Sequence, residues 1–414
     1  MVVKYLQRVL IVSALAIFVV SLAAAQSSRP RRTTEPKQDS LLLPQPTPAP
    51  TPRKTNTPLL DIQPVKPVGE APVTPGTDTG DTTHAYSLFQ QGQYAAAAKE
   101  AKQLATADPQ NAEAWKLAGF SEFALKQFDK AAEDLQKALE LQRAAKQEDP
   151  NTLDQLAQAY TLLQKFDQAL PLLVIATSRP GAQPDPLLLY NRGLAEYETG
   201  KFTEAELSFN QVVKANPKDA RSLNYLGLIA LKKKDLDGAI AAFNRATVND
   251  PRFDFAWIQL LSAYLRRAGS ATDESKATGD YLSAVRAGEG LIKIRTDASA
   301  VTLFGQALIG AKDYVRAAAA LDRAAAGKDA EEGTFYLLGV AQSRAKNFPK
   351  AIAALERAAQ KKPDDVNVYR ELGYAYEVMK QYAKALTAYE KGLGLIPNDA
   401  DFKESADRVR PFAK

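Results

Sequence analysis

The stretch "NYLGLIALKKKDLDGAIAAFNRA", residues Asn224–Ala246, contains two apolar segments at helical spacing with a short polar turn between them. A run of three lysines, ending at Lys234, lies at the turn and resembles a basic patch for phosphate or lipid. The same pattern returns in "YNRGLAEYETGKFTEAELSFNQVVKANP", which starts at Tyr190, and in "YLLGVAQSRAKNFPKAIAALERAAQKKP", which starts at Tyr336. Segments that recur in this way indicate an internal repeat.

The repeat has a period of 34 residues, which separates Gly193 from Gly227 and Gly339 from Gly373. Extending this register in both directions gives nine units, which start near Asp78, Ala112, Pro150, Pro186, Ala220, Asp254, Ala298, Glu332 and Val366. Position twenty of every unit is alanine, and position seventeen is aromatic in every unit but one, where it is Leu236. Nine aligned alanines indicate one structural unit repeated along the chain.

Helix packing explains these columns. We expect the small residue at position eight and the alanine at position twenty to face each other where the two helices of a pair approach closely. A larger side chain there would overpack the contact, at a cost of roughly 1–3 kcal/mol. The aromatic residue at position seventeen starts the second helix, and a proline near position thirty-two ends it because proline cannot continue a helix.

These columns together resemble the tetratricopeptide repeat, from about Asp78 to Asp399. The resemblance implies an all-α fold, a right-handed superhelical solenoid of antiparallel helix pairs whose first helices line a concave groove. Residues 400–414 then form a C-terminal capping helix. Four units depart from the pattern. Unit one has an indistinct start and no aromatic residue at position four, and unit two runs on through 141–150. Unit three ends in a proline-rich break at 179–186, and unit six has Leu261 at position eight and an insertion at 266–280 between its helices.

The N-terminal 77 residues have a different composition. Residues 1–25 combine basic residues, an apolar run and a small-residue end, which is typical of a signal peptide. The alternative is an uncleaved membrane anchor over Val9–Ala25. Residues 26–77 are rich in Pro and Thr and are expected to form a disordered linker, either passive or a ligand for a proline-binding partner.

Composition excludes several kinds of chemistry. The chain has no cysteine, so disulfides, thiolate metal sites and cysteine nucleophiles are excluded. Its one histidine, His84, is expected at a packing position of unit one. A net charge of +5 is small for 414 residues and does not suggest nucleic-acid binding. We expect no catalytic residues, no cofactor and no metal, and therefore a protein that is not an enzyme.

Surface recognition remains, and the resemblance places it on the first helices. Positions two, five, nine and twelve should point into the groove. The candidate partner-binding residues are Lys116, Phe120, Phe123, Tyr190, Leu194, Tyr197, Arg221, Asn224, Leu228, Phe255, Ile258, Tyr336, Arg370 and Tyr374. The alternative is that several of them only pack between successive first helices. A clamp for chaperone tails, known in the family, is not expected, because Asp154 and Gln158 stand where Lys and Asn are needed and Tyr225 replaces Arg.

These features favour a non-enzymatic scaffold or adaptor of the bacterial cell envelope, exported and periplasmic, that binds protein or peptide segments. One alternative is a membrane-anchored protein held off the membrane by its proline-rich spacer. Another is a glycan or small-ligand binder that uses Tyr190, Tyr197, Tyr336 and Tyr374. The lysine run is largely explained by its place, since Lys234 is at position fifteen, the C-terminal end of a first helix, where other units have Lys or Gly.

Overall fold

The computed structural model describes residues 81–181, 183–328 and 330–414. Over these ranges it contains nineteen α-helices, one 3₁₀ helix and no strand. Within the same ranges no helix combines the length and the apolar character that crossing a bilayer requires. The expected signal peptide, residues 1–25, and the expected linker, residues 26–77, lie outside the described residues.

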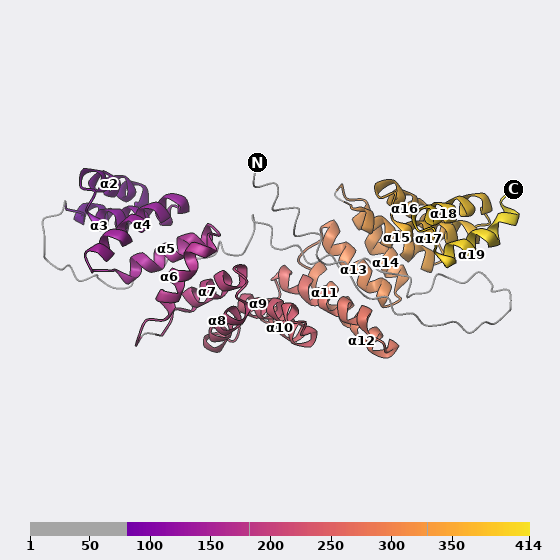
Figure 1. Cartoon of the computed structure of the whole chain (residues 1–414), viewed down its shortest axis with the longest axis horizontal. Coiled ribbons are helices and arrows are strands. Elements are labelled where there is room, and N and C mark those ends of the chain that lie inside the picture. The colour runs from indigo at the N-terminus through magenta and orange to yellow at the C-terminus, as the bar shows by residue number, and fades with distance from the viewer. Residues whose placement is uncertain (1–80, 182, 329) are drawn as a thin grey trace. The chain divides into compact units, whose positions relative to one another are not determined.

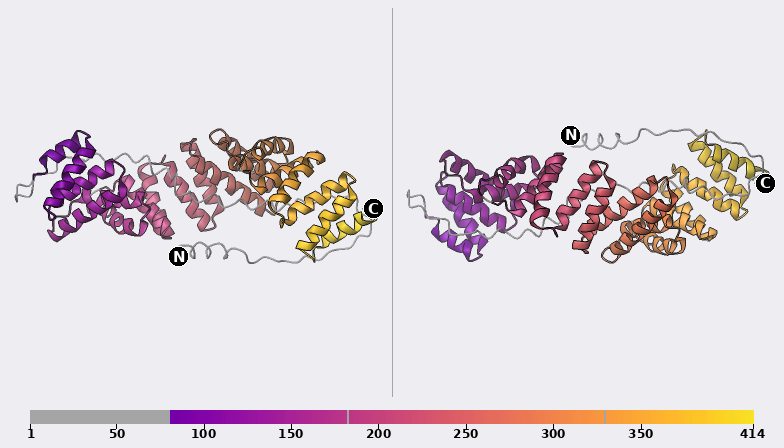
Figure 2. Two further views of the ribbon diagram at one scale, coloured as in Figure 1. Left: turned by 90° about the horizontal axis from the view of Figure 1, so that it is seen from above. Right: turned by 90° about the horizontal axis from the view of Figure 1, so that it is seen from below.

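Eighteen of the described helices form nine consecutive pairs, and each pair lies beside the next in chain order (Figures 1 and 2). The pairs are α1 (Thr83–Gln90) with α2 (Tyr94–Ala107), α3 (Ala112–Ala124) with α4 (Phe128–Ala144), α5 (Pro150–Leu162) with α6 (Phe166–Thr177), α7 (Pro186–Glu198) with α8 (Phe202–Ala215), α9 (Ala220–Lys232) with α10 (Leu236–Asn249), α11 (Asp254–Ser270) with α12 (Glu274–Ile292), α13 (Ala298–Gly310) with α14 (Tyr314–Ala325), α15 (Glu332–Arg344) with α16 (Phe348–Lys361), and α17 (Val366–Val378) with α18 (Tyr382–Leu395). The result is an all-α solenoid in which helices contact their sequence neighbours.

In six of the nine pairs, a glycine on the first helix meets a large side chain on the second. A Cβ added at Gly227 would lie 2.4 Å from the ring of Phe243, and one added at Gly373 would lie 2.2 Å from the ring of Tyr389. These rings stand at position twenty-four, whereas we expected the glycine to face the alanine at position twenty. In the other units with a glycine at position eight, position twenty-four is likewise large, either Leu or Phe, so this side chain, rather than the alanine, sets the need for a small residue at position eight.

In unit six the large residue is on the first helix and the small residue is on the second. Leu261 holds position eight, and Gly288 holds position twenty-four, where an added Cβ would lie 3.1 Å from the Leu261 side chain and 2.4 Å from the Phe304 ring of α13. The expected insertion at 266–280 does not form a separate loop, because most of it continues α11 and α12 by about a turn or more each. The longer helices remain one pair in the stack.

The turn between the helices of a pair depends on one residue in a left-handed conformation. Position fifteen has positive φ in eight units, at Gly92, Lys126, Gln164, Gly200, Lys234, Lys312, Lys346 and Lys380. At the end of α9, the Lys234 N–H donates to the Leu231 carbonyl at 3.1 Å, and the Asp235 N–H donates to the Ala230 carbonyl at 2.9 Å. This is the hydrogen-bond pattern that ends helices at a left-handed residue.

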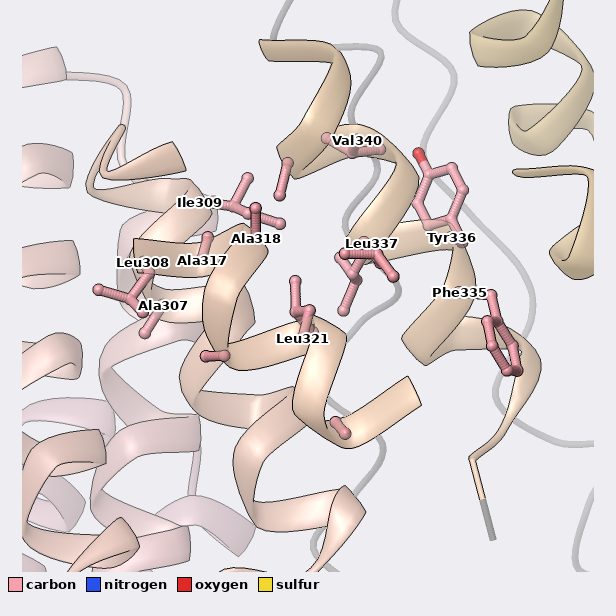
Figure 3. Close-up of a cluster of buried hydrophobic side chains, with 14 of the residues drawn as sticks. Ala307, Leu308, Ile309, Ala317, Ala318, Leu321, Phe335, Tyr336, Leu337 and Val340 are labelled. Atoms are coloured by element: carbon pink, nitrogen blue, oxygen red, sulfur yellow. The ribbon is translucent and has the colours of Figure 1, made fainter. Parts of the chain in front are cut away.

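Alanine and leucine fill the core between the pairs. Figure 3 shows side chains of α13, α14 and α15 meeting, among them Ile309, Leu321 and Leu337, all nearly inaccessible to solvent. At the C-terminal end, α19 (Ala400–Val409) covers the last pair with Phe402 inserted against Gly392, and the 3₁₀ helix η3 (Arg410–Phe412) follows. The expected capping helix is therefore present, with a buried aromatic anchor and a polar outer side.

Candidate partner-binding face

We call positions two, five, nine and twelve of the first helices the first-helix face. Half of the fourteen candidate residues on this face are partly exposed, and half are buried. The partly exposed residues are Lys116, Phe120, Tyr197, Arg221, Leu228, Phe255 and Arg370. The buried residues are Phe123, Tyr190, Leu194, Asn224, Ile258, Tyr336 and Tyr374.

The buried candidates present little surface to a partner. Tyr190, Tyr336 and Tyr374 are each less than a tenth exposed, so of the four tyrosines considered for glycan stacking only Tyr197 is half-buried. Their positions agree with the alternative reading, in which residues at positions five and nine pack between neighbouring helices. A role for any of the fourteen residues in partner binding stays a prediction.

Two candidate cations on the face are held by acidic residues at the N-termini of later helices, α5 and α19. The Lys116 ammonium lies 3.1 Å from the Asp149 carboxylate, and the Arg370 guanidinium donates to Asp399 at 2.7 Å. Asp149 and Asp399 also accept backbone N–H groups at the N-termini of α5 and α19. These position-five cations therefore join one unit to the next as well as facing the groove side.

Lys116 shows how strong this pairing is. Burial disfavours its ammonium, but the carboxylates of Glu113 and Asp149 outweigh burial and raise the pKa of Lys116. The lysine therefore stays charged and engaged with two carboxylates. A partner that needed this cation would have to compete with both of them.

An aromatic cluster joins α7, α8 and α9. The Tyr225 ring stacks on Phe209 with centroids 5.0 Å apart, and it meets Tyr190 and Tyr197 edge-on at 6.1 and 5.3 Å. The Arg221 guanidinium lies 4.8 Å from the centroid of the Tyr190 ring. Tyr225 was not among the candidates, because position six was left out of the groove set. The available signal was an aromatic residue on a first helix, directly after the groove position Asn224.

Charge in this cluster comes from cations and not from phenolates. Burial raises the pKa of Tyr197 to about 12, and burial also raises the pKa of Tyr190 and Tyr225. The three hydroxyls therefore stay protonated near neutral pH. What they offer is apolar ring surface with hydroxyl groups that donate and accept hydrogen bonds.

The clamp residues are occupied or buried. Arg179 donates two hydrogen bonds to the Asp154 carboxylate, at 2.8 and 2.5 Å, and Gln158 is buried. Asp154 and Gln158 lie on α5, at the places where a clamp would need Lys and Asn. The Asp154 carboxylate is thus already paired with an arginine of the same chain.

A polar cluster lies inside unit two, where the sequence led us to expect the neighbouring acids Glu133 and Asp134 on a solvated helical face, whereas Asp134 is buried. Glu122 on α3 and Asp134 on α4 are both buried, and the Lys102 ammonium of α2 pairs with Asp134. Burial, reinforced by the charge of Asp134, raises the pKa of Glu122 to about 7. Two carboxylates and one lysine at a helix contact form a proton-sensitive part of the core.

His84 is not a packing residue, contrary to expectation. The first helix begins only at Thr83, so His84 lies at its exposed N-terminal turn, and its Nδ1 is 2.8 Å from Glu100 Oε2. In the part of the chain that the structure describes, no three His, Asp or Glu side chains come close enough together to hold a metal ion.

Comparison with known proteins places this geometry in context. The sequence model described as tetratricopeptide repeat matches residues 82–150, 155–211, 190–252 and 336–400, which together make up more than half of the chain. No curated protein sequence matches.

Solved structures of the same kind align with the solenoid. MamA is 25% identical, and the alignment covers 42% of this chain and 97% of MamA with a TM-score of 0.37. YrrB, described as a tetratricopeptide repeat protein with an unusual peptide-binding site, is 17% identical over 48% of this chain and 97% of its own, with a TM-score of 0.40. The C-terminal part of a repeat protein from Cytophaga hutchinsonii is 18% identical over 61% of this chain and 98% of its own, with a TM-score of 0.48.

Proposed function

The chain belongs to the tetratricopeptide repeat family, and from this premise we propose that it is a non-enzymatic scaffold that binds segments of partner proteins on its first-helix face. Proteins of this solenoid type present long surfaces made of repeated helices, which suit extended or helical segments of another chain. The partner is a protein or peptide, and no cofactor is required.

The observation that carries this proposal is that three consecutive first helices each keep an apolar side chain of this face incompletely buried. Tyr197 on α7, Leu228 on α9 and Phe255 on α11 keep part of their surface open, although the side chains around them are buried. The cations Arg221 and Lys232 lie at the two ends of α9, on either side of Leu228. Aromatic and aliphatic anchors with nearby cations are the residues that most often carry binding energy at protein interfaces.

We place this scaffold in the bacterial cell envelope, exported to the periplasm. The support is the sequence of residues 1–25, with its basic start, apolar run and Ala23–Ala25 end before Gln26. The alternative keeps Val9–Ala25 as an anchor in the inner membrane, with the solenoid facing the periplasm. Mass spectrometry of the purified protein distinguishes them, because cleavage predicts a chain that starts at Gln26.

Site-specific crosslinking in the native cell tests the binding proposal. A photoreactive amino acid at Leu228 should give a discrete crosslinked product with a partner protein. The same amino acid at Val248, which is 70% exposed on the second helix α10, serves as the control. Equal products from both positions, or none from Leu228, would reject the first-helix face as the binding surface.

A further inference from the structure

Units two and four carry a buried glutamate at the same position, and the two glutamates have different hydrogen-bond partners. Glu196, at position eleven on α7, accepts from the Arg192 guanidinium at 2.8 Å and from the Ser208 hydroxyl of α8 at 2.6 Å. Ser208 is at position twenty-three, so positions eleven and twenty-three face each other across the helix pair. Glu196 can remain a buried carboxylate, because both of its oxygens have donors.

Unit two lacks both of these donors. At the position of Arg192 it has Ala118, and at the position of Ser208 it has Asp134. Glu122, at position eleven, is 8% exposed, and Asp134 is 2% exposed. Glu122 Oε2 and Asp134 Oδ2 are both buried, and neither has a hydrogen-bond partner in the part of the chain that the structure describes. Ionised carboxyl groups only accept hydrogen bonds, so two that face each other need a proton between them.

The charges around the two carboxyl groups do not replace this proton. The nearest are Lys130 and Glu133 on α4 and Lys102 on α2, whose ammonium pairs with Asp134. The other helices in contact with α3 are α1 and α5. Each has one titratable side chain, which is already paired, in the pairs His84–Glu100 and Asp154–Arg179. The cluster therefore has one paired cation for two buried carboxyl groups.

The position of the proton follows from the surroundings of each acid. Burial, and after it the negative charge of Asp134, raise the pKa of Glu122 to about 7. Asp134 keeps its ion pair with Lys102, which favours its charged form. Glu122 therefore holds the proton and donates it to the Asp134 carboxylate, which accepts from Lys102 with its other oxygen.

The shared proton lies at the contact between α3 and α4. Two further contacts close the same pair: Gly119 packs against Leu135, and the Phe123 ring meets the Phe128 ring edge-on, with centroids 5.2 Å apart. Phe128 is the first residue of α4, and Phe123, a candidate residue of the first-helix face, is 4% exposed. Two ionised carboxyl groups in this contact would repel each other, and separation of the helices would return both to water.

We propose that Glu122 and Asp134 share one proton that holds α4 against α3, and that loss of this proton as the pH rises opens unit two and uncovers Phe123. The opening is specific to unit two, because in unit four Arg192 and Ser208 supply the donors that the proton replaces. The opening itself does not depend on partner binding. Its consequence, an apolar contact at Phe123 that depends on pH, rests on the proposed function of the first-helix face.

A single buried cysteine can report the opening, because the chain contains none. Ala131→Cys places a thiol on α4 near Gly119, and Ala205→Cys places one at the same position of unit four, where both alanines are 0% exposed. Between pH 5 and pH 8 the rate of thiol alkylation should rise about tenfold more for Ala131→Cys than for Ala205→Cys. Adding Asp134→Ser, the residue of unit four, should remove this excess, because a hydroxyl then donates to Glu122.

Two results would overturn the proposal. An equal rise for the two cysteines would mean that unit two opens no more readily than unit four when the pH rises. An excess that persists with Asp134→Ser would mean that the opening does not depend on the two carboxyl groups. Amide hydrogen exchange of α4 and α8 in the cysteine-free chain repeats the comparison, and it decides the matter if Ala131→Cys disturbs the helix contact. Failure of the Leu228 crosslinking test would reject the proposed function without affecting the opening of unit two.

Discussion

Arg344 at the end of α15 donates two hydrogen bonds to the carboxylate of Glu371 on α17, at 2.9 and 3.1 Å, and both side chains are about 5% exposed or less. The pair joins the first helices of units eight and nine. A buried ion pair adds little net stability compared with apolar residues, but each partner depends on the other to remain buried. Arg344 and Glu371 are therefore both needed where the first helices of units eight and nine meet.

Replacing Arg344 alone should destabilise the solenoid strongly. Arg344→Met leaves the Glu371 carboxylate buried without its cation, which costs about 3–5 kcal/mol. Urea unfolding followed by circular dichroism should show a lower midpoint. Arg316→Met is the control, because Arg316 and its partner Glu289 are both about half exposed and such pairs contribute less than about 1 kcal/mol. Equal midpoints for the two variants would contradict the structural role of the buried pair.

The glycine at position eight should be sensitive to a single methyl group. In Gly227→Ala the new Cβ would lie 2.4 Å from the Phe243 ring, so the ring must move, at a cost of about 1–3 kcal/mol that exceeds the gain in helix propensity. Thermal unfolding measures the loss. Gly279→Ala on α12 is the matched control, because nothing lies within 4 Å of its added Cβ, and it should gain up to about 1 kcal/mol. Two variants that shift the midpoint in the same direction would contradict this account.

Unit two should lose stability as pH rises toward neutrality and above. The pKa of Glu122 is raised from 4.5 to about 7 by burial and by Asp134, so the folded state holds a proton that the unfolded state releases. The stabilisation is complete below about pH 4.5 and is lost as the pH rises through 7. Amide hydrogen exchange of α3 and α4 at pH 5 and pH 8 measures this change in the stability of unit two.

Glu122→Gln removes the titration and provides the control for this pH dependence. The variant mimics the protonated acid, so it should equal the parent at pH 5 and be more stable by about 2 kcal/mol at pH 8, after solvent screening is allowed for. A variant that is equally stable or less stable than the parent at pH 8 would show that Glu122 is charged and satisfied in the folded protein.

The periodic columns predict most of the fold because each column reports a local requirement. Helices α3 and α9 begin at Ala112 and Ala220, the residues where units two and five were expected to start. The lysines of position fifteen were read as helix-end residues, and the positive φ of Lys234 gives the stronger reason for that place. Helix ends and close contacts within one pair depend on residues that are near in sequence, so a single unit contains the information.

Contacts between units were much harder to predict. The pairing of Lys116 with Asp149 spans two helix pairs, and the column of position five alone does not show whether its residue points to solvent or to the next unit. The exchange of Leu261 and Gly288 is visible only when both helices of unit six are compared in space. Burial on the first-helix face depends on the size of the neighbouring side chains, which is why Tyr190 is buried and Tyr197 is not.

The lysine run at the end of α9 offers a last test, since two of its residues are expected to respond in opposite ways to glycine. Lys234 has φ of 63°, a conformation that costs a non-glycine residue about 1 kcal/mol, so Lys234→Gly should stabilise the solenoid by up to that amount. Lys232 is the last residue of the helix, and Lys232→Gly should cost about 0.5–1 kcal/mol. Both changes remove one positive charge, so charge alone predicts equal shifts in the thermal midpoint. Shifts of opposite sign would establish that backbone conformation, and not a basic surface, determines the residue at position fifteen.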